Sequence, residues 1–273
     1  MFLTKLRKPI DTYAPWLAHS YRIARDLTSS RLSRKTEYGF QLAGDSRMAQ
    51  SDFETAEART FAQLCDVHDV VLDIGANVGF YSCLAASRGN HVLAFEPAPR
   101  NLAFLYQNLW SNGFSAVEVF PIGLGPQPGL MPLYGFGGIT SFVLGWAQAC
   151  GKGSHFAPVA TLDFFTARKF EGQRLLIKMD VEGFELAVLS GAIETLSHKP
   201  QPTWMVEILL NDSAIPDGIN ANFRETFEVF WSNNYRCKAL ESDQTEITPD
   251  IVEKWTISGA VERGTRNFLF TGE

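Results

Sequence analysis

Apolar runs alternate along this chain with segments in which apolar residues recur every three or four positions. The runs 70–74, 91–95 and 116–120 are rich in β-branched and aromatic residues and predict buried strands. The segments 80–86 and 102–109 lie between them and have the composition and spacing of helices. This alternation indicates a doubly wound α/β fold around a parallel sheet.

The second half of the chain continues the same alternation. Four further strands are predicted at residues 174–179, 202–208, 235–240 and 266–271. We expect no helix between the last two strands, so that the seventh strand runs antiparallel to its neighbours. Glycine and proline recur between residues 123 and 145, and this predicts a β-hairpin insertion with Ile139, Thr140 and Ser141 near the pocket.

The N-terminal part differs from the rest. Residues 10–30 predict an amphipathic helix, which would cover a sheet edge, contact a partner subunit or lie on a membrane surface; its apolar positions are Tyr13, Trp16, Leu17, Tyr21, Ala24 and Leu27. Residues 31–50 read as a polar connector. A helix then starts near residue 51, with an apolar face expected at Phe53, Ala56, Thr60 and Leu64. We therefore divide the chain into a basic helical extension, residues 1–50, and an α/β domain, residues 51–273.

Charge separates the same two parts. The 273 residues are 45% hydrophobic and 12% aromatic, which suffices for one large domain with an extension. Residues 1–36 contain eight of the 24 Lys and Arg but only Asp11 and Asp26 of the 30 acids, so their net charge is +6 and that of the remainder is −12. An acidic body is a poor partner for nucleic acid, because phosphates are held by clustered Lys and Arg.

The spacing of the cysteines and histidines predicts reduced thiols and no zinc site. The four cysteines form no C-x-x-C pair, and neither a secretory apolar segment nor an 18-residue apolar run is present. The five histidines lack H-E-x-x-H or comparable spacing. We expect a cytoplasmic protein with reduced thiols and no protein-held metal.

The first strand ends in two glycines four residues apart. Gly75 should allow a sharp reversal with positive φ, and Gly79 should let the following helix lie close to the sheet. A dinucleotide fingerprint has a third glycine between them for a pyrophosphate, and this chain has Asn77 instead. Asn77 suits a ligand without pyrophosphate, such as S-adenosylmethionine (SAM), whose amino-acid end would meet the loop and Asp73. A purely structural turn is the alternative.

An acid follows the second strand at the position where a ribose is bound in such folds. Glu96 lies 17 residues after Gly79, and Pro97 ends the strand directly behind it. A carboxylate there accepts hydrogen bonds from two ribose hydroxyls. NAD and SAM both carry a free ribose diol, so Glu96 indicates an adenosine-type ligand without choosing between them.

Acids also cluster after the fourth and fifth strands. Asp180, Glu182 and Glu185 fall within six residues, and Glu207 ends the fifth strand. If the fourth strand lies beside the first across the topological switch point, Asp180 and Glu182 point into the ligand crevice. A solvated helix start, where acids favour the macrodipole, accounts for Glu182 and Glu185 but less well for Asp180.

Four motifs in this order resemble those of the FkbM family of SAM-dependent methyltransferases. They are Asp-Ile-Gly-Ala-Asn-Val-Gly-Phe-Tyr at 73–81, Phe-Glu-Pro-Ala-Pro at 95–99, Thr-Leu-Asp at 161–163 and Ile-Lys-Met-Asp-Val-Glu-Gly-Phe-Glu at 177–185. The resemblance spans residues 54 to 240. Phe184 departs from it, because the family often has a small residue at this position.

The resemblance implies a class I methyltransferase fold, Rossmann-like, with a seven-stranded mostly parallel sheet, helices on both faces and an antiparallel seventh strand. It implies O-methylation of a sugar, glycan or natural-product acceptor, with SAM as cofactor. Carried over by position, the methionine part of SAM would be held by Asp73, Gly75, Asn77 and Gly79, the ribose by Glu96, and the adenine edge by Ile122 and Gly123.

For catalysis we expect Asp180 to act as base or acceptor-positioning group. Glu182 and Glu207 would orient it and raise its pKa by like-charge proximity. A divalent cation shared by these acids is an alternative. Two other functions also stay open at this point, an NAD-type Rossmann oxidoreductase and a SAM-binding scaffold that transfers nothing. We expect a small-molecule or glycan partner, and oligomer or surface contacts through the N-terminal helix.

Overall fold

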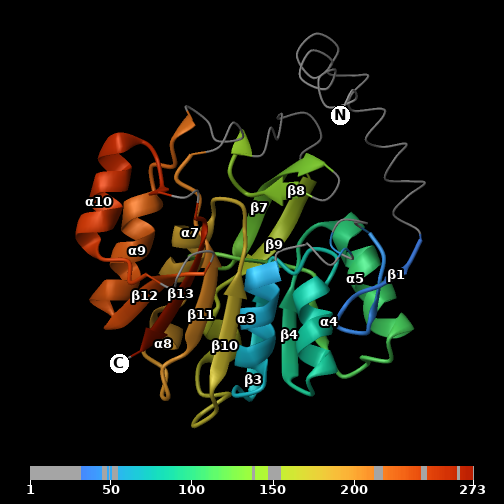
Figure 1. Cartoon of the computed structure of the whole chain (residues 1–273). Helices are drawn as coiled ribbons and strands as arrows, with labels where there is room; N and C mark the ends of the chain where they lie inside the picture. The colour runs from blue at the N-terminus through green and yellow to red at the C-terminus, as the bar shows by residue number, and fades with distance from the viewer. Residues whose placement is uncertain are drawn as a thin grey trace.

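The computed structural model describes residues 32–44, 48, 50, 55–136, 139–146, 155–211, 218–240, 245–262 and 265–272. Its strands form a seven-stranded central sheet, a four-stranded sheet and a two-stranded ribbon (Figure 1). The predicted helix at residues 10–30 lies outside the described residues. The domain boundary near residue 50 therefore stays a prediction.

The central sheet has the order β12-β13-β11-β10-β3-β4-β5. Its strands are β3 (Val70–Ile74), β4 (His91–Phe95), β5 (Glu118–Phe120), β10 (Leu175–Met179), β11 (Thr203–Glu207), β12 (Tyr235–Ala239) and β13 (Asn267–Gly272). β3 pairs in parallel with both β4 and β10, whereas β13 runs antiparallel to β11 and β12. The predicted Rossmann-like sheet with an antiparallel seventh strand is thus confirmed, and the topological switch point lies between β3 and β10.

Helices cover both faces of this sheet, and the alternation of side chains along β3 shows why. Val70, Leu72 and Ile74 pack into one hydrophobic cluster, whereas Val71 packs into the other. The second cluster is closed by α3 (Thr55–Cys65), α4 (Phe80–Ser87) and α5 (Pro99–Ser111), and α3 and α4 lie in front of β3 and β4 in Figure 1. The first is closed mainly by α7 (Glu185–Ser190), α8 (Ile193–Leu196), α9 (Phe223–Ser232) and α10 (Pro249–Ser258).

The buried face of α3 differs from the predicted one. Phe61, Ala62 and Cys65 are buried, whereas Ala56 is exposed and Leu64 is only half-buried. The Phe61 ring packs edge-on against Tyr81 of α4, with the ring centroids 4.9 Å apart. This aromatic contact, together with the hydrogen bond that Asn267 of β13 donates to Glu57, accounts for the face of α3 that is buried.

The expectation of a connection without a helix between β12 and β13 is wrong. α10 lies there, with Pro249 in its first turn and Gly259 at its C-terminal end with φ +67°. Its buried residues are Val252 and Trp255, and it packs against α9. β13 is still antiparallel, because α10 stays beside α9 and the chain then re-enters the sheet between β11 and β12.

Part of the segment 31–50 belongs to the core and is not simply a polar connector. The short strands β1 (Arg34–Lys35) and β2 (Gln41–Leu42) pair antiparallel, and Phe40, Leu42 and Ala43 are buried. The Asn108 side chain of α5 accepts from the Ala43 backbone N–H at 2.8 Å and donates to the Ala43 carbonyl at 2.9 Å. A buried amide that is satisfied in this way fixes the ribbon to the domain.

The predicted hairpin insertion is confirmed. β7 (Gly129–Phe136) and β8 (Ile139–Ser141) pair antiparallel, and with β6 (Gly123–Leu124) and β9 (His155–Ala160) they form the sheet β6-β9-β7-β8. The short helix α6 (Asp163–Thr166) then leads back towards β10.

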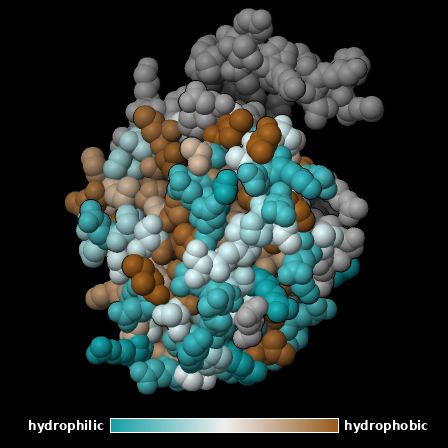
Figure 2. All heavy atoms as spheres, turned by 90° about the vertical axis from the view of Figure 1, so that its left-hand side faces the viewer, coloured by the Kyte–Doolittle hydropathy of each residue, from teal (hydrophilic) through white to brown (hydrophobic). Residues whose placement is uncertain are grey.

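On the side of α9 and α10, hydrophobic side chains lie in small groups among polar ones (Figure 2). Ile257 on α10 is among the exposed isoleucines of the described chain. Within the described residues, no helix combines the length and the apolar character that a membrane crossing needs.

Candidate functional site

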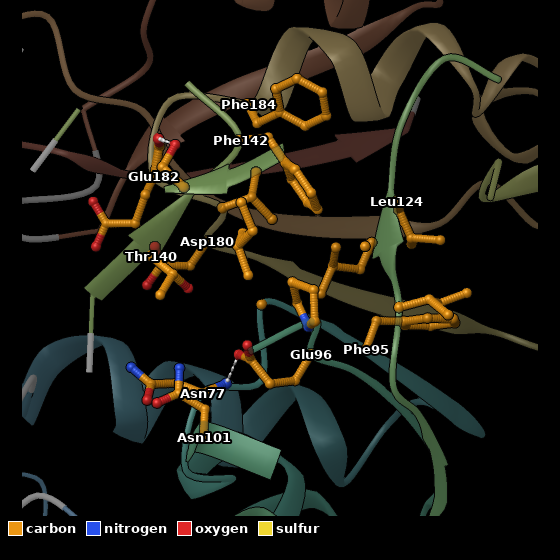
Figure 3. A pocket seen from close by; sticks show the side chains of 18 residues that line it. Asn77, Phe95, Glu96, Asn101, Leu124, Thr140, Phe142, Asp180, Glu182 and Phe184 are labelled. Atoms are coloured by element: carbon orange, nitrogen blue, oxygen red, sulfur yellow. Dashed lines mark hydrogen bonds between the residues drawn. The ribbon is translucent and has the colours of Figure 1, made fainter. Parts of the chain in front are cut away.

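A pocket opens at the carboxyl ends of β3, β4 and β10 (Figure 3). Seven of the ten predicted site residues line it: Gly75, Asn77, Glu96, Ile122, Gly123, Asp180 and Glu182. Thr140 and Ser141 of β8 also line it, as the sequence predicts for the insertion. Asp73, Gly79 and Glu207 do not line the pocket.

The turn after β3 needs glycine at position 75. Gly75 has φ +82°, and a Cβ built there would lie 1.9 Å from the Asp180 backbone oxygen. Its N–H donates to the Phe95 carbonyl at 3.0 Å, so the chain reverses directly over β4. Both the positive φ and the close approach exclude a side chain. The loop after β3 and the loop after β10 therefore touch at this point.

Glu96 fixes the second half of this turn. Asn77 has φ +51°, and its backbone N–H donates to Glu96 Oε2 at 2.8 Å; the Ala98 N–H donates to Oε1 at 2.7 Å. The Asn101 side chain is a further hydrogen-bond partner. Burial raises the pKa of Glu96 to about 7, and these hydrogen bonds counter part of that rise. Figure 3 shows Asn77, Asn101 and Glu96 together at one end of the pocket.

Asp73 lies below the pocket. Its Oδ2 accepts a hydrogen bond from Ser82 Oγ of α4 at 2.5 Å, and the side chain is buried. Burial raises the pKa of Asp73 to about 6, while Ser82 and the charge of Lys178 oppose the rise. Asp73 thus holds the first turn of α4 against β3 from beneath the loop.

The reason we expected for Gly79 is wrong in one respect. Gly79 has φ +89°, and a Cβ there would lie 2.4 Å from Leu105 Cδ1 of α5. The close approach is therefore between two helices, and not between α4 and the sheet. Glycine is still required, because both the backbone conformation and the packing exclude a side chain.

Asp180 is the first residue after β10. Its backbone N–H donates to the Ile74 carbonyl at 3.0 Å, and its Oδ2 lies 3.6 Å from Lys178 Nζ. Lys178 is 2% exposed, pairs in register with Asp73 on β3, and its Nζ lies 5.1 Å from the centroid of the Tyr81 ring. A buried cation needs such partners. The Lys178 side chain offsets part of the negative charge of Asp73 and Asp180.

Glu207 ends β11 and lies behind Asp180. Burial raises the pKa of Glu207 well above its ordinary value, and the negative charge of Asp180 adds to this. A hydrogen bond to Asp180 acts in the same direction, and Arg266 Nε lies 3.4 Å from Glu207 Oε1. Glu207 is therefore placed to hold Asp180 through a carboxyl–carboxylate contact.

Glu182 is held by the insertion. Trp146 Nε1 donates to Glu182 Oε2 at 3.1 Å, and Ser141 Oγ donates to the Glu182 carbonyl at 2.7 Å. Glu182 has φ +53°, and the Trp146 ring covers Gly183 so closely that a Cβ there would lie 2.4 Å from it. The turn after β10 and the insertion thus lock each other into one conformation.

Glu185 is buried at the start of α7, where its Oε1 accepts from the Gly183 N–H at 3.0 Å. Burial raises the pKa of Glu185 to about 7 from its ordinary 4.5. The contribution of Glu185 to the free energy of unfolding is therefore complete below pH 4.5. It is lost as the pH rises through 7, because the folded protein must then bury a charged carboxylate. The loss amounts to roughly 3 kcal/mol by pH 8, at ~1.4 kcal/mol per pKa unit.

We predict that Glu185→Gln removes this loss, because the amide oxygen still accepts from Gly183 and carries no charge. Urea unfolding of both proteins at pH 5 and pH 8 measures the effect. The variant should gain stability relative to the parent at pH 8 and little at pH 5. Glu194→Gln on the exposed surface of α8 is the control. An equal pH dependence in parent and Glu185→Gln would contradict this reading of Glu185.

Several residues of the site were not predicted. Asn101, Phe142 and Phe184 line the pocket, and Ser82 and Trp146 support acids that do so or lie below it. Asn101 had a detectable signal, because it is a polar residue in the first turn of the helix that follows Glu96. Trp146 had none, since its partner Glu182 lies 36 positions further along the chain.

Within the described part of the chain, no three His, Cys, Asp or Glu side chains are grouped as a metal site would need. Cys65, Cys83 and Cys237 are buried free thiols.

The sheet order, the glycine turn and the acid that ends β4 are those of a Rossmann-like methyltransferase. A model of the family described as "Methyltransferase FkbM domain" matches residues 73–237, which is more than half of the chain. The chain belongs to the FkbM family of SAM-dependent methyltransferases, and SAM is the family's cofactor.

A curated relative is the hexuronic acid methyltransferase AglP of Haloferax volcanii. It is 28% identical over 148 residues, which cover 50% of this chain and 56% of that protein, so the match spans about half of the relative's length. A solved structure of methyltransferase FkbM from Methylobacillus flagellatus aligns with a TM-score of 0.46 at 17% identity, over 84% of this chain and 56% of that one. An O-methyltransferase from Bacillus cereus in complex with SAH aligns with a TM-score of 0.47 at 12% identity, over 99% and 98% of the two chains.

Proposed function

We propose that this protein transfers the methyl group of SAM to a hydroxyl group of a sugar, a glycan or a related natural product. The observation that carries the proposal is the division of the pocket into an apolar and an acidic end. Phe95 and Leu124 lie on one side in Figure 3, and Asp180, Thr140 and Glu182 lie on the other. The first suits an adenine ring, and the second suits a positively charged sulfonium and a hydroxylated acceptor.

The residues of the pocket fit SAM. The apolar wall at Ile122, Gly123 and Leu124 suits adenine, Glu96 suits the ribose hydroxyls, and the loop at Gly75 and Asn77 suits the amino-acid part. When it is bound, SAM supplies an electrophilic methyl group on a sulfonium. A pyrophosphate would meet Asn77, which supports the choice of SAM over the NAD-type oxidoreductase considered above.

On the acceptor side, Asp180 would accept the proton of the attacking hydroxyl or orient it. Methyl transfer is an in-line displacement, so holding the acceptor oxygen at attack distance supplies much of the acceleration, up to ~7 to 11 kcal/mol. Glu207 and Lys178 hold Asp180 from behind, and Glu182 borders the acceptor space from the insertion side. In its ammonium form Lys178 has no lone pair and cannot itself accept the proton.

The name of the Haloferax volcanii relative supports a sugar acceptor. The test is incubation with SAM labelled in its methyl group and a panel of sugars, glycans and hydroxylated metabolites, followed by detection of labelled acceptor. Labelled product is the expected result. Tight SAM binding without any labelled acceptor would favour the non-transferring scaffold.

We also propose that the basic N-terminal segment acts outside the chemistry, in contacts with another copy or with an anionic surface. Its eight Lys and Arg against two acids within residues 1–36 support this role. A truncation that starts at Ser33 keeps β1 and the buried Phe40. It should retain SAM affinity and lose self-association or binding to anionic vesicles, as measured by sedimentation and vesicle pull-down. Loss of SAM binding by a folded truncated protein would contradict the proposal.

A further inference from the structure

Among the described residues that line the pocket, the ionisable ones are all acids. They are Glu96, Asp180 and Glu182, and none of the described lining residues is Lys, Arg or His. Glu96 lies at the ribose position of the proposed cofactor arrangement. Asp180 and Glu182 are therefore the charges that an acceptor would meet.

Two cations of the described chain at this end lie against carboxylates. Lys178 Nζ lies 3.6 Å from Asp180 Oδ2, and Arg266 Nε lies 3.4 Å from Glu207 Oε1. Lys178 is also buried at 2% exposure beneath the pocket floor. An acceptor carboxylate placed beside Asp180 and Glu182 would thus meet like charge, and like-charge contacts in a partly desolvated site are strongly unfavourable.

Glu182 cannot turn away from such an acceptor without breaking the local structure. Trp146 Nε1 holds its carboxylate at 3.1 Å, Ser141 Oγ holds its backbone carbonyl, and the ring of Trp146 packs on Gly183. Trp146 itself is only 3% exposed. The negative charge of Glu182 is therefore fixed in place at the border of the pocket. Its charge also raises the pKa of Glu207, which shows that the two acids sense each other.

We propose that Glu182, held in position by Trp146, selects neutral or cationic hydroxylated acceptors and rejects acceptors that carry a carboxylate on the reacting unit. The proposal rests on the proposed function and narrows its substrate class to neutral sugars, amino sugars and comparable polyols.

The test uses matched acceptor triplets with SAM labelled in its methyl group. Each triplet contains the methyl glycoside of a hexose, of its 2-amino sugar and of its uronic acid, for the gluco, galacto and manno series. The neutral or amino member should exceed its uronic acid in kcat/KM by at least about 10-fold, which corresponds to ~1.4 kcal/mol. A uronic acid that reacts better than its neutral counterpart overturns the proposal. No product from any triplet, with SAM binding intact, contradicts the proposed function itself.

Variants then test whether Glu182 is responsible for the discrimination between neutral and carboxylate acceptors. Glu182→Gln should raise the ratio of uronic acid to neutral sugar about 10-fold with unchanged affinity for the demethylated cofactor, and Glu171→Gln on the exposed surface should not. Trp146→Phe keeps the ring on Gly183, removes the N–H donor and should shift the ratio in the same direction. In a Glu182→Ala background the same Trp146 change should have no further effect on the ratio. An unchanged ratio in Glu182→Gln overturns the assignment even if Trp146→Phe does not fold.

Discussion

Replacing Asp180 with asparagine should lower turnover by ~10² to 10⁴-fold, which is the range that general-base catalysis supplies. Asparagine keeps the shape of the side chain and its backbone contact with β3, but its amide oxygen is not basic. SAM affinity should stay nearly unchanged, because the proposed cofactor contacts come from the loops after β3 and β4. The effect is expected in kcat, with a smaller change in KM for the acceptor.

Single-turnover rates with labelled SAM measure this effect separately from product release. Asp250→Asn, an exposed change in the first turn of α10, is the matched control and should behave as the parent. Near-normal turnover of Asp180→Asn would remove the base role from this residue. A parent activity that a chelator abolishes and magnesium restores would transfer the role to a metal ion.

Replacing Glu96 with alanine should weaken SAM binding by roughly 10- to 150-fold, since a hydrogen bond to a charged group contributes ~1.5 to 3 kcal/mol. The structure adds a second cause. The backbone N–H groups of Asn77 and Ala98 both donate to this carboxylate, so its removal leaves the loop without its support. Cofactor contact and loop order are lost together.

Calorimetric titration with SAM, with its demethylated product and with NAD measures the three binding affinities and so tests both this prediction and the cofactor preference. The parent should bind SAM and not NAD. Glu96→Gln should lie between parent and Glu96→Ala, because its amide oxygen can accept one of the two backbone N–H groups. SAM binding by Glu96→Ala at parental strength would show that Glu96 does not contact the cofactor.

The central sheet could be predicted because its strands are short, apolar and bounded by breakers. The run at 70–74 ends at Gly75, and the run at 91–95 ends before Pro97. Parallel strands are buried on both faces, so they show as continuous apolar runs that need no partner to be recognised. Gly75, Glu96 and Asp180 then meet at one edge, because the carboxyl ends of parallel strands do.

Other features depend on contacts that sequence spacing does not contain. Glu207 ends a strand as predicted, yet it lies behind Asp180 rather than in the pocket, because β11 is the outer neighbour of β10. The hydrogen bond from Trp146 to Glu182 connects the segment after β8 with the turn after β10, and these belong to different sheets. The buried face of α3 was misjudged because Ala56, Ala58 and Ala62 lie on different sides of the helix. The contacts that bury the observed face, such as Phe61 with Tyr81 and Glu57 with Asn267, join segments that are distant in sequence.

The strands β6 to β9 pair with one another and, within the described chain, with no strand of the central sheet. Their loops can therefore change in length without moving the register on which Gly75 and Glu96 depend. Thr140, Ser141 and Trp146, which border or brace the acceptor end, come from this separate unit or the segment that follows it. The molecule is in this sense modular: exchanging the loops of β7 and β8 would alter the acceptor end, while β6, which carries Gly123 and Leu124 of the proposed adenine wall, would have to be retained.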